Sequence, residues 1–236
     1  RMGFNNRGQS QAVERLARRD RSRGIVGVNI GANKDSPDRI ADYAYGARSV
    51  TGVADYLTVN ISSPNTPGLR QLQDEGALTA LLSAISDART VGGPPVFLKV
   101  APDLGEGEPD QIVRVALRHN IDAIIVANTT ISRPPLKSRW AGEVGGLSGE
   151  PLKALALDAL RRFRSASGGG IPLIAAGGIA SADDAWARIR AGASLVQLYS
   201  AMVYHGPGLG RRIARGLVQR VQDAGLASIS EAVGSE

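Results

Sequence analysis

The stretch Ala123-Ile124-Ile125-Val126-Ala127-Asn128 is apolar, rich in β-branched residues and ends on a single amide. A short apolar run of this kind is typical of a strand buried on both faces of a parallel sheet. Five other runs share its character: 25–29, 56–60, 96–100, 172–178 and 195–200. Amphipathic helix patterns separate the runs, so the chain alternates strand and helix. This alternation predicts an α/β fold with a parallel sheet.

Two of the predicted helices have recognisable ends. Ser36-Pro37-Asp38 predicts a helix with Ser36 as N-cap and the proline at the first helical position. The sequence Ser181-Ala182-Asp183-Asp184 resembles a capping box with Asp in place of Glu, and Gly192 is placed to end that helix. No linker or low-complexity segment interrupts the alternation, so residues 1–236 are predicted to form one domain.

The ends of the predicted strands distinguish two α/β architectures, an open doubly wound sheet and a closed eight-stranded barrel. Four strands finish on or beside a polar amide or amine, at Asn29, Asn60, Lys99 and Asn128. In an open sheet only the strands at the switch point carry ligand groups, whereas every strand of a barrel ends at one common mouth. The pattern favours a (β/α)8 TIM barrel. Six βα units are recognisable, and we expect two more to precede Arg1.

Composition excludes several kinds of site. The 236 residues contain no cysteine and two histidines, which excludes a disulfide scaffold, a Cys-ligated metal and a Cys nucleophile, and no metal site is predicted. The net charge of +6 comes with arginines at helical spacing that are not interleaved with aromatic residues. We therefore expect solvated helix faces and no nucleic-acid binding. These arginines are Arg15, Arg18, Arg19, Arg211, Arg212, Arg215 and Arg220.

The most distinctive loop is Asn60-Ile61-Ser62-Ser63-Pro64-Asn65-Thr66-Pro67-Gly68-Leu69-Arg70. It follows a predicted strand and offers amides and hydroxyls between Pro and Gly residues. Such a loop could close over a small polar ligand. The same residue types also form ordinary turns, and composition alone leaves both interpretations open.

Taken together with seven other motifs, this loop resembles the dihydroorotate dehydrogenase family, and within it the membrane-associated class that uses quinone. The resemblance runs from Arg1 to about Gly234. The other motifs are Met2-Gly3-Phe4-Asn5-Asn6, Gly27-Val28-Asn29-Ile30-Gly31-Ala32-Asn33-Lys34, Lys99-Val100-Ala101-Pro102-Asp103, Asn128-Thr129-Thr130, Gly145-Gly146-Leu147-Ser148-Gly149, Ala176-Gly177-Gly178 and Gly192-Ala193-Ser194-Leu195-Val196-Gln197-Leu198-Tyr199-Ser200.

The resemblance implies a barrel that holds FMN at the carboxyl ends of its strands. It also implies oxidation of dihydroorotate to orotate, with electrons passed to a quinone, in the de novo pyrimidine pathway to UMP. This reaction removes a proton from C5 and a hydride from C6, so a general base must face the flavin. By resemblance the base is Ser63, with a proton path that involves Thr66 and Phe4 beside a water. Ser62 is interpreted as a turn hydroxyl.

The resemblance also assigns binding residues. A lysine within a buried strand is costly unless an anion compensates it, and Lys99 is expected to stabilise the anionic reduced flavin. The cofactor-binding residues implied are Asn29, Asn60, Lys99, Asn128, Ser148, Gly149, Gly177, Gly178, Tyr199 and Ser200, the last four together with Gly149 lying near the phosphate. The substrate-binding residues implied are Phe4, Asn60, Asn65, Asn128 and Thr129.

Two other functions remain open at this point. One is a related FMN barrel that passes electrons to fumarate or NAD, although those classes carry cysteine at the position of Ser63. The other is an FMN-free chain with only a binding role. The resemblance further implies a peripheral protein on the cytoplasmic face of a bacterial inner membrane, held there by a segment outside this sequence.

Overall fold

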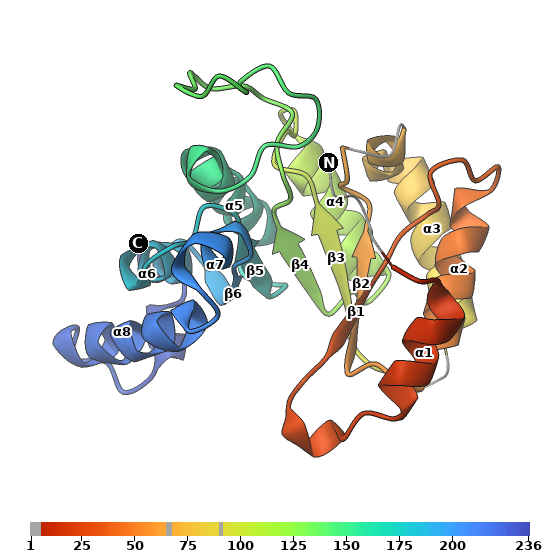
Figure 1. Cartoon of the computed structure of the whole chain (residues 1–236), viewed down its shortest axis with the longest axis horizontal. Coiled ribbons are helices and arrows are strands. Elements are labelled where there is room, and N and C mark those ends of the chain that lie inside the picture. The colour runs from red at the N-terminus through yellow and green to blue at the C-terminus, as the bar shows by residue number, and fades with distance from the viewer. Residues whose placement is uncertain (1–5, 65–67, 90–91) are drawn as a thin grey trace.

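The computed structural model describes residues 6–64, 68–89 and 92–236. Within these residues one sheet contains six parallel strands in chain order, each hydrogen-bonded to the next (Figure 1). The strands are β1 Gly27–Ile30, β2 Tyr56–Asn60, β3 Val96–Val100, β4 Ala123–Val126, β5 Leu173–Ala176 and β6 Ala193–Gln197. A doubly wound sheet reverses its strand order at a switch point, and this sheet has no reversal. Consecutive order is that of successive βα units around a barrel.

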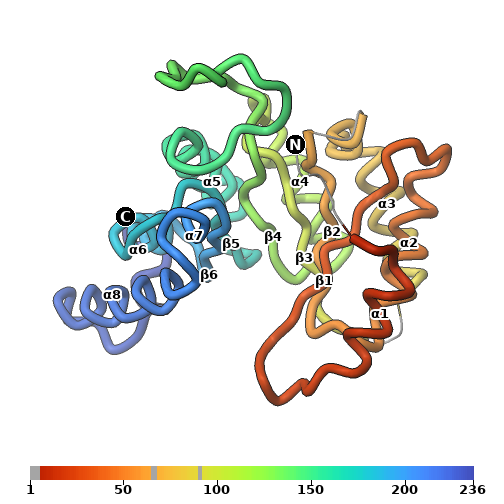
Figure 2. Tube along the Cα trace, in the orientation of Figure 1, coloured from red at the N-terminus to blue at the C-terminus, as the bar shows by residue number. Residues whose placement is uncertain are grey.

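Helices cover the outer side of the curved sheet (Figure 1). The connecting helices are α2 Arg39–Val50, α3 Glu75–Ala88, α4 Glu108–Arg118, α5 Lys153–Ser167 and α6 Ala182–Arg190. The chain also forms α1 Gln9–Ala17, α7 Ser200–His205, α8 Leu209–Asp223 and the 3-10 turns η1 Arg21–Arg23, η2 Leu69–Gln73, η3 Glu150–Leu152 and η4 Ile229–Ala232. The segment between β4 and α5 extends well beyond the strand ends (Figure 2). No helix in the described part of the chain is long and apolar enough to cross a membrane.

Alternation along the strands divides the apolar residues between two faces. On β3, Val96, Leu98 and Val100 are buried and belong to the core between sheet and helices, whereas Phe97 and Lys99 face the other way. A second, smaller cluster on the inner face contains Ala123, Ile125 and Ile174, with Phe97 and Ala176 packed against it. Asn60 and Lys99, the polar residues near the carboxyl ends of β2 and β3, lie on this inner face.

The predicted strands agree with the structure most closely at the centre of the sheet. β2 and β3 have the predicted bounds. The expectation that every strand is buried on both faces is wrong at the two edges, where Asn29 is exposed and Leu195 on β6 is 59% exposed. Among the described strands β1 and β6 each have one neighbour, so part of each stays uncovered. The run predicted over 195–200 is also displaced, because β6 ends at Gln197.

The two predicted helix starts have different outcomes. Ser181 caps α6 by accepting from the Asp184 amide, as predicted, and Asp184 accepts from the amide of Ala180. The N-cap of α2 is Asp38, which accepts from the Ala41 amide at 2.9 Å, so the prediction of Ser36 is wrong by two residues. A carboxylate in extended backbone geometry can accept this hydrogen bond as well as a serine hydroxyl can.

The predicted solvated arginine faces are confirmed with one exception. Arg211, Arg212, Arg215 and Arg220 on α8 are exposed, as are Arg15 and Arg18. Arg19 is half-buried and forms an ion pair with Asp55 at 2.8 Å. Asp55 directly precedes β2, so this pair lies at the amino end of the sheet.

Candidate active site

Asn60 and Lys99 lie side by side on the inner face of the sheet. They are register partners on β2 and β3, and Ile125 on β4 follows Lys99 in the same row. Asn29 pairs with Thr58, one row of side chains nearer the amino ends, and is exposed. The structure therefore brings Asn60 and Lys99 together and places Asn29 in a separate row.

Asn60, Ser62 and Asn128 form a hydrogen-bonded cluster at the ends of β2 and β4. The Ser62 hydroxyl donates to Asn60 Oδ1 at 2.8 Å, and the Asn128 amide donates to Ser62 Oγ at 2.8 Å and to Asn60 Oδ1 at 3.3 Å. Asn60 and Ser62 are buried. Ser62 was predicted as a turn hydroxyl only, and the structure gives it the further role of orienting two asparagines.

Ser63 follows this cluster in the chain and is also buried, with 3% of its surface exposed. It lies in the irregular segment that leaves the carboxyl end of β2. The residues predicted to act beside it, Phe4 and Thr66, and the predicted substrate contact Asn65 lie outside the described residues.

The ammonium of Lys99 is in an unusual electrostatic position. Burial lowers the pKa of Lys99 below its ordinary value. Within the described part of the chain no carboxylate lies within ion-pair distance of it. A buried cation without an anionic partner is costly, and an anionic ligand would offset that cost.

A cavity of about 770 Å3 opens beside Lys99 at the carboxyl ends of β3 to β6. Its volume is within the range of small-molecule and cofactor sites. The predicted site residues that line it are Lys99, Asn128, Thr129, Ser148, Gly149, Gly177, Gly178, Tyr199 and Ser200. Asn29, Asn60 and Ser63 are not among the lining residues.

The loop after β5 approaches helix α5 too closely to accept a side chain. Gly178 has a φ of +69°, and a Cβ there would lie 2.5 Å from Lys153 Cα. Arg188 on α6, which is 2% exposed, donates to the carbonyls of Gly177 at 3.2 Å and Lys153 at 2.6 Å. This backbone is therefore held in place at one end of the cavity, where close approach to an anion is possible.

Ser148 and Ser200 meet at the end of the cavity that Gly177 and Gly178 also line. Ser200 Oγ donates to Ser148 Oγ at 2.9 Å, which joins the loop before η3 to the start of α7. Tyr199 lies between β6 and α7 and is 77% exposed. Neither Tyr199 nor Ser200 belongs to a strand, because β6 ends earlier than predicted.

An aromatic pair near the floor of the cavity was not predicted. The rings of Tyr56 and Phe97 stack with centroids 4.8 Å apart, and Tyr56 also lines the cavity. Both residues lie at inner-face positions of their strands, as Asn60 and Lys99 do. Alternation within the runs 56–60 and 96–100 was the signal that could have identified them.

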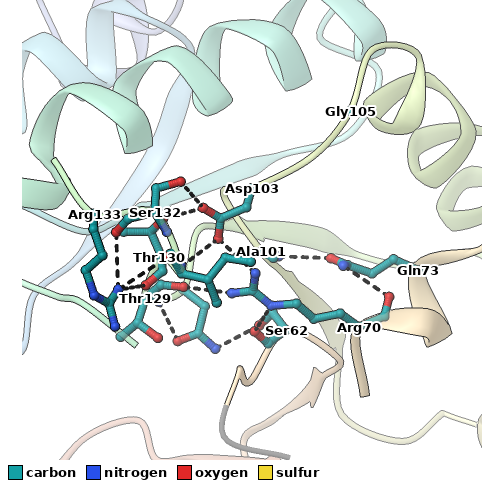
Figure 3. A network of polar contacts seen from close by, with 12 residues as sticks. Ser62, Arg70, Gln73, Ala101, Asp103, Gly105, Thr129, Thr130, Ser132 and Arg133 are labelled. Atoms are coloured by element: carbon teal, nitrogen blue, oxygen red, sulfur yellow. Dashed lines mark hydrogen bonds and ion pairs between the residues drawn. The ribbon is translucent and has the colours of Figure 1, made fainter. Parts of the chain in front are cut away.

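Arg70 and Asp103 are the other residues that sequence reasoning missed. Arg70 Nη1 donates to Asp103 Oδ2 at 2.8 Å, and both side chains lie among the loops that follow β2, β3 and β4 (Figure 3). Both belong to motifs quoted above, but no role was assigned to them. The rule that polar residues after strand ends meet at one mouth applies equally to Asp103.

Comparison with known proteins identifies the family of this chain. The family model for dihydroorotate dehydrogenase matches residues 1–221. The chain belongs to the dihydroorotate dehydrogenase family.

Two relatives of this chain carry the same name. A protein of Erythrobacter litoralis named dihydroorotate dehydrogenase (quinone) is 64% identical over all of this chain and 69% of its own length. A protein of Novosphingobium aromaticivorans with the same name is 63% identical over all of this chain and 69% of its own length.

Solved structures of dihydroorotate dehydrogenase share the fold. The ligand-free enzyme of Eimeria tenella superimposes with a TM-score of 0.93 and 39% identity, over all of this chain and 72% of that chain. The same enzyme in complex with ferulenol gives a TM-score of 0.92 and 37% identity, over 98% of this chain and 69% of the other. The predicted family and the predicted barrel-type α/β fold with six βα units are therefore confirmed.

Proposed function

We propose that the protein oxidises dihydroorotate to orotate with bound FMN and passes the electrons to a quinone. The observation that carries this proposal is the ammonium of Lys99, which has no carboxylate partner among the described residues and lies beside Asn60 at a cavity that ends on Gly177 and Gly178. The family membership and the names of the relatives support the reaction, and de novo pyrimidine biosynthesis is its place in metabolism. On this proposal residues 1–236 form an FMN-binding barrel domain.

The cavity fits FMN by the chemistry of its donors. Lys99 supplies a cation toward the ring, and Gly177 and Gly178 supply backbone that an anionic phosphate can approach. Ser148, Ser200, Gly149 and Tyr199 line the same end. Asn29, Asn60 and Asn128 complete the proposed cofactor contacts. When bound, FMN supplies the acceptor for the hydride that leaves C6 of dihydroorotate.

Ser63 is proposed to take the proton from C5. A serine hydroxyl is a weak base unless another group accepts its proton, and Ser63 is buried away from bulk water. We therefore assign the onward proton path to the Thr66 hydroxyl and a water beside Phe4, as the family resemblance implies.

Amides are proposed to hold the substrate. Asn60, Asn65, Asn128 and Thr129 are assigned to its pyrimidine ring and carboxylate, and Phe4 is assigned as a further substrate contact. An amide is uncharged and carries both a donor and an acceptor, so it can recognise the ring without shifting the pKa of the base. The internal hydrogen bonds of Asn60, Ser62 and Asn128 hold two of these amides in place before substrate enters.

Quinone is favoured over fumarate or NAD as the electron acceptor. The classes that use fumarate or NAD carry cysteine as the base, whereas this chain has Ser63 and no cysteine. Because a quinone is dissolved in the bilayer, we place the protein at the cytoplasmic face of a bacterial inner membrane as a peripheral protein.

One experiment tests the reaction and the acceptor together. The purified protein should show the visible absorption bands of a flavin, which dihydroorotate bleaches and decylubiquinone restores. Fumarate or NAD restoring the bands faster than decylubiquinone would identify the related class instead. A colourless protein that takes up no FMN would indicate a binding role only.

A further inference from the structure

One guanidinium joins the loops that follow three neighbouring strands. Arg70, in η2 after β2, donates through Nε to the Ser62 carbonyl at 3.2 Å and through Nη2 to the Thr129 carbonyl at 3.0 Å. Its Nη1 donates to Asp103, which follows β3. All three nitrogens of the side chain therefore have a partner, each on a different loop segment (Figure 3).

Asp103 extends this connection along the segment after β4. Its carboxylate accepts from the hydroxyls of Thr130 and Ser132 and from the Ile131 amide. Burial acts to raise the pKa of Asp103, but these hydrogen bonds and that of Arg70 outweigh it and lower the pKa. Asp103 is therefore a carboxylate at neutral pH and holds the partner charge of Arg70.

A second contact fixes η2 against β3. Gln73 in η2 accepts from the Ala101 amide at 2.9 Å and donates to the Arg70 carbonyl at 3.3 Å. The backbone that carries Arg70 is thus attached to the end of β3 independently of the guanidinium. Arg70 therefore extends from a fixed base, and its planar group has a defined orientation.

The two carbonyls that Arg70 binds flank the proposed reacting groups. The Ser62 carbonyl belongs to the peptide that leads into Ser63, and the Thr129 carbonyl follows Asn128. On the opposite side the Ser62 hydroxyl binds Asn128. The separation between Ser63 and the amide of Asn128 is thus set by hydrogen bonds on both sides of the loops.

We propose that Arg70, held by Asp103, is a positioning residue that keeps Ser63 in register with Asn128 and Thr129 across the substrate site. The proposal rests on the function proposed above and assigns no contact between Arg70 and substrate. The guanidinium positions the base through the Ser62 peptide, and a lysine cannot replace it because an ammonium lacks the planar fork that reaches three acceptors. Misplacing a reacting group by about 1 Å can slow a reaction about 100-fold.

The chain contains a matched control at the other end of the sheet. Arg19 and Asp55 also form an ion pair at 2.8 Å, with side chains 15% and 19% exposed, against 20% and 11% for Arg70 and Asp103. Arg19 likewise donates to a backbone carbonyl, that of Gly24. Arg19→Gln therefore reports the general effect of breaking such a pair far from the cavity.

The test compares Arg70→Gln, Arg70→Lys and Asp103→Asn with Arg19→Gln in the FMN-loaded protein. Single-turnover bleaching of the flavin by dihydroorotate should slow about 100-fold in both Arg70 variants. Deuterium at C5 of dihydroorotate should slow flavin bleaching by a larger factor in the Arg70 variants than in the wild type. The reason is that proton removal from C5 becomes slower relative to hydride transfer from C6. FMN content and Tm should match those of Arg19→Gln.

Amide hydrogen exchange adds a readout that does not depend on turnover. Both Arg70 variants should exchange faster in residues 68–73 and 128–132, and Arg19→Gln should not. Unchanged exchange there, or a rate loss no greater than that of Arg19→Gln, overturns the proposal. If Arg70→Gln does not fold, Asp103→Asn decides by the same measures, because it keeps the size of the side chain and removes its charge. A wild type whose flavin dihydroorotate does not bleach refutes the proposed function instead, and exchange then still decides whether Arg70 couples the loops.

Discussion

Asn60 and Lys99 are register partners on β2 and β3, and Lys99, which lines the cavity, has no carboxylate within ion-pair distance among the described residues. An amide and an unpaired ammonium in adjacent positions form a site prepared for an electron-rich ring with a negative charge. The folded protein bears the cost of the unpaired cation until an anionic ligand offsets it.

Replacing Lys99 should therefore increase the stability of the protein and weaken its binding of FMN. Lys99→Met should raise the Tm of the FMN-free protein by roughly 2–4 °C for each kcal/mol of desolvation removed, and should weaken FMN binding. Because burial lowers the folded pKa of Lys99 below 10.5, the unfolded chain holds this proton more tightly. The lysine thus costs stability at neutral pH, and the cost fades as pH rises from the folded pKa toward 10.5.

Thermal unfolding of wild type and Lys99→Met at pH 7 and at pH 10 measures this effect, with FMN affinity measured by titration. The Tm difference should be larger at pH 7. An equal difference at both pH values, or tighter FMN binding by the variant, contradicts the assignment of Lys99.

Alanine substitutions of Ser62 and Ser63 should impair different properties of the enzyme. Ser63→Ala removes the proposed base, so bleaching of the flavin by dihydroorotate should slow about 100- to 10,000-fold while FMN stays bound. Ser62→Ala removes the hydroxyl that orients Asn60 and Asn128, so orotate affinity should fall about 10-fold with a smaller loss of rate.

Stopped-flow absorbance and orotate titration separate the two serine variants. Retained single-turnover bleaching in Ser63→Ala would refute its role as the base. A Ser62→Ala protein with unchanged orotate affinity would show that the asparagines keep their orientation without it.

Gly178 offers a test of the approach between the loop after β5 and helix α5. Gly178→Ala should reduce FMN affinity and lower the Tm, because its Cβ would lie 2.5 Å from Lys153 Cα. Gly225→Ala is the control, since Gly225 has nearly the same φ, +68° against +69°, and no atom within 4 Å of an added Cβ. The difference in Tm between the two variants isolates the clash from the shared backbone strain. Equal losses in both variants would mean that the loop moves aside at no cost.

Acid stability should depend on Asp55. A hydrogen bond from the Val26 amide, together with the ion pairs to Arg21 and Arg19, lowers the pKa of Asp55 from 3.8 to about 2. A lowered folded pKa contributes stability above pH 3.8 that is lost as pH falls toward 2. Asp55→Asn should therefore flatten the dependence of Tm on pH between 4 and 2. A variant with the same slope as wild type in that interval would contradict this.

The central strands were predictable because each consists mostly of buried apolar residues whose local pattern is sufficient. Residues 96–100 are an example, since Val96, Leu98 and Val100 are all covered by helices. β6 was less predictable, because the register shift near Leu173 and Ile174 pairs β5 with Ala193 and then Leu195. That irregularity depends on the neighbouring strand and has no local signature.

The candidate site likewise contains residues that were predictable from the sequence and residues that were not. The proximity of Asn60, Lys99 and Asn128 was predictable from their positions alone, since parallel strands end at one edge of the sheet. The role of Arg70 was not, because its three acceptors lie at Ser62, Asp103 and Thr129, and only the folded chain brings these together. The cluster around Ser62 was missed for the same reason.

Because the strands of the sheet lie in the order of the sequence, substrate-binding and phosphate-binding loops can change independently during evolution. Apart from Phe4, the groups assigned to dihydroorotate come from residues 60–129, and those assigned to the phosphate end come from residues 148–200. Each set occupies its own continuous block of sequence, so exchange of one block leaves the other block's loops attached to their own strands. Variation in substrate preference can therefore accumulate in the first block while the second retains the phosphate end of the cofactor site, and chimaeras joined between β4 and α5 are the natural unit for redesign.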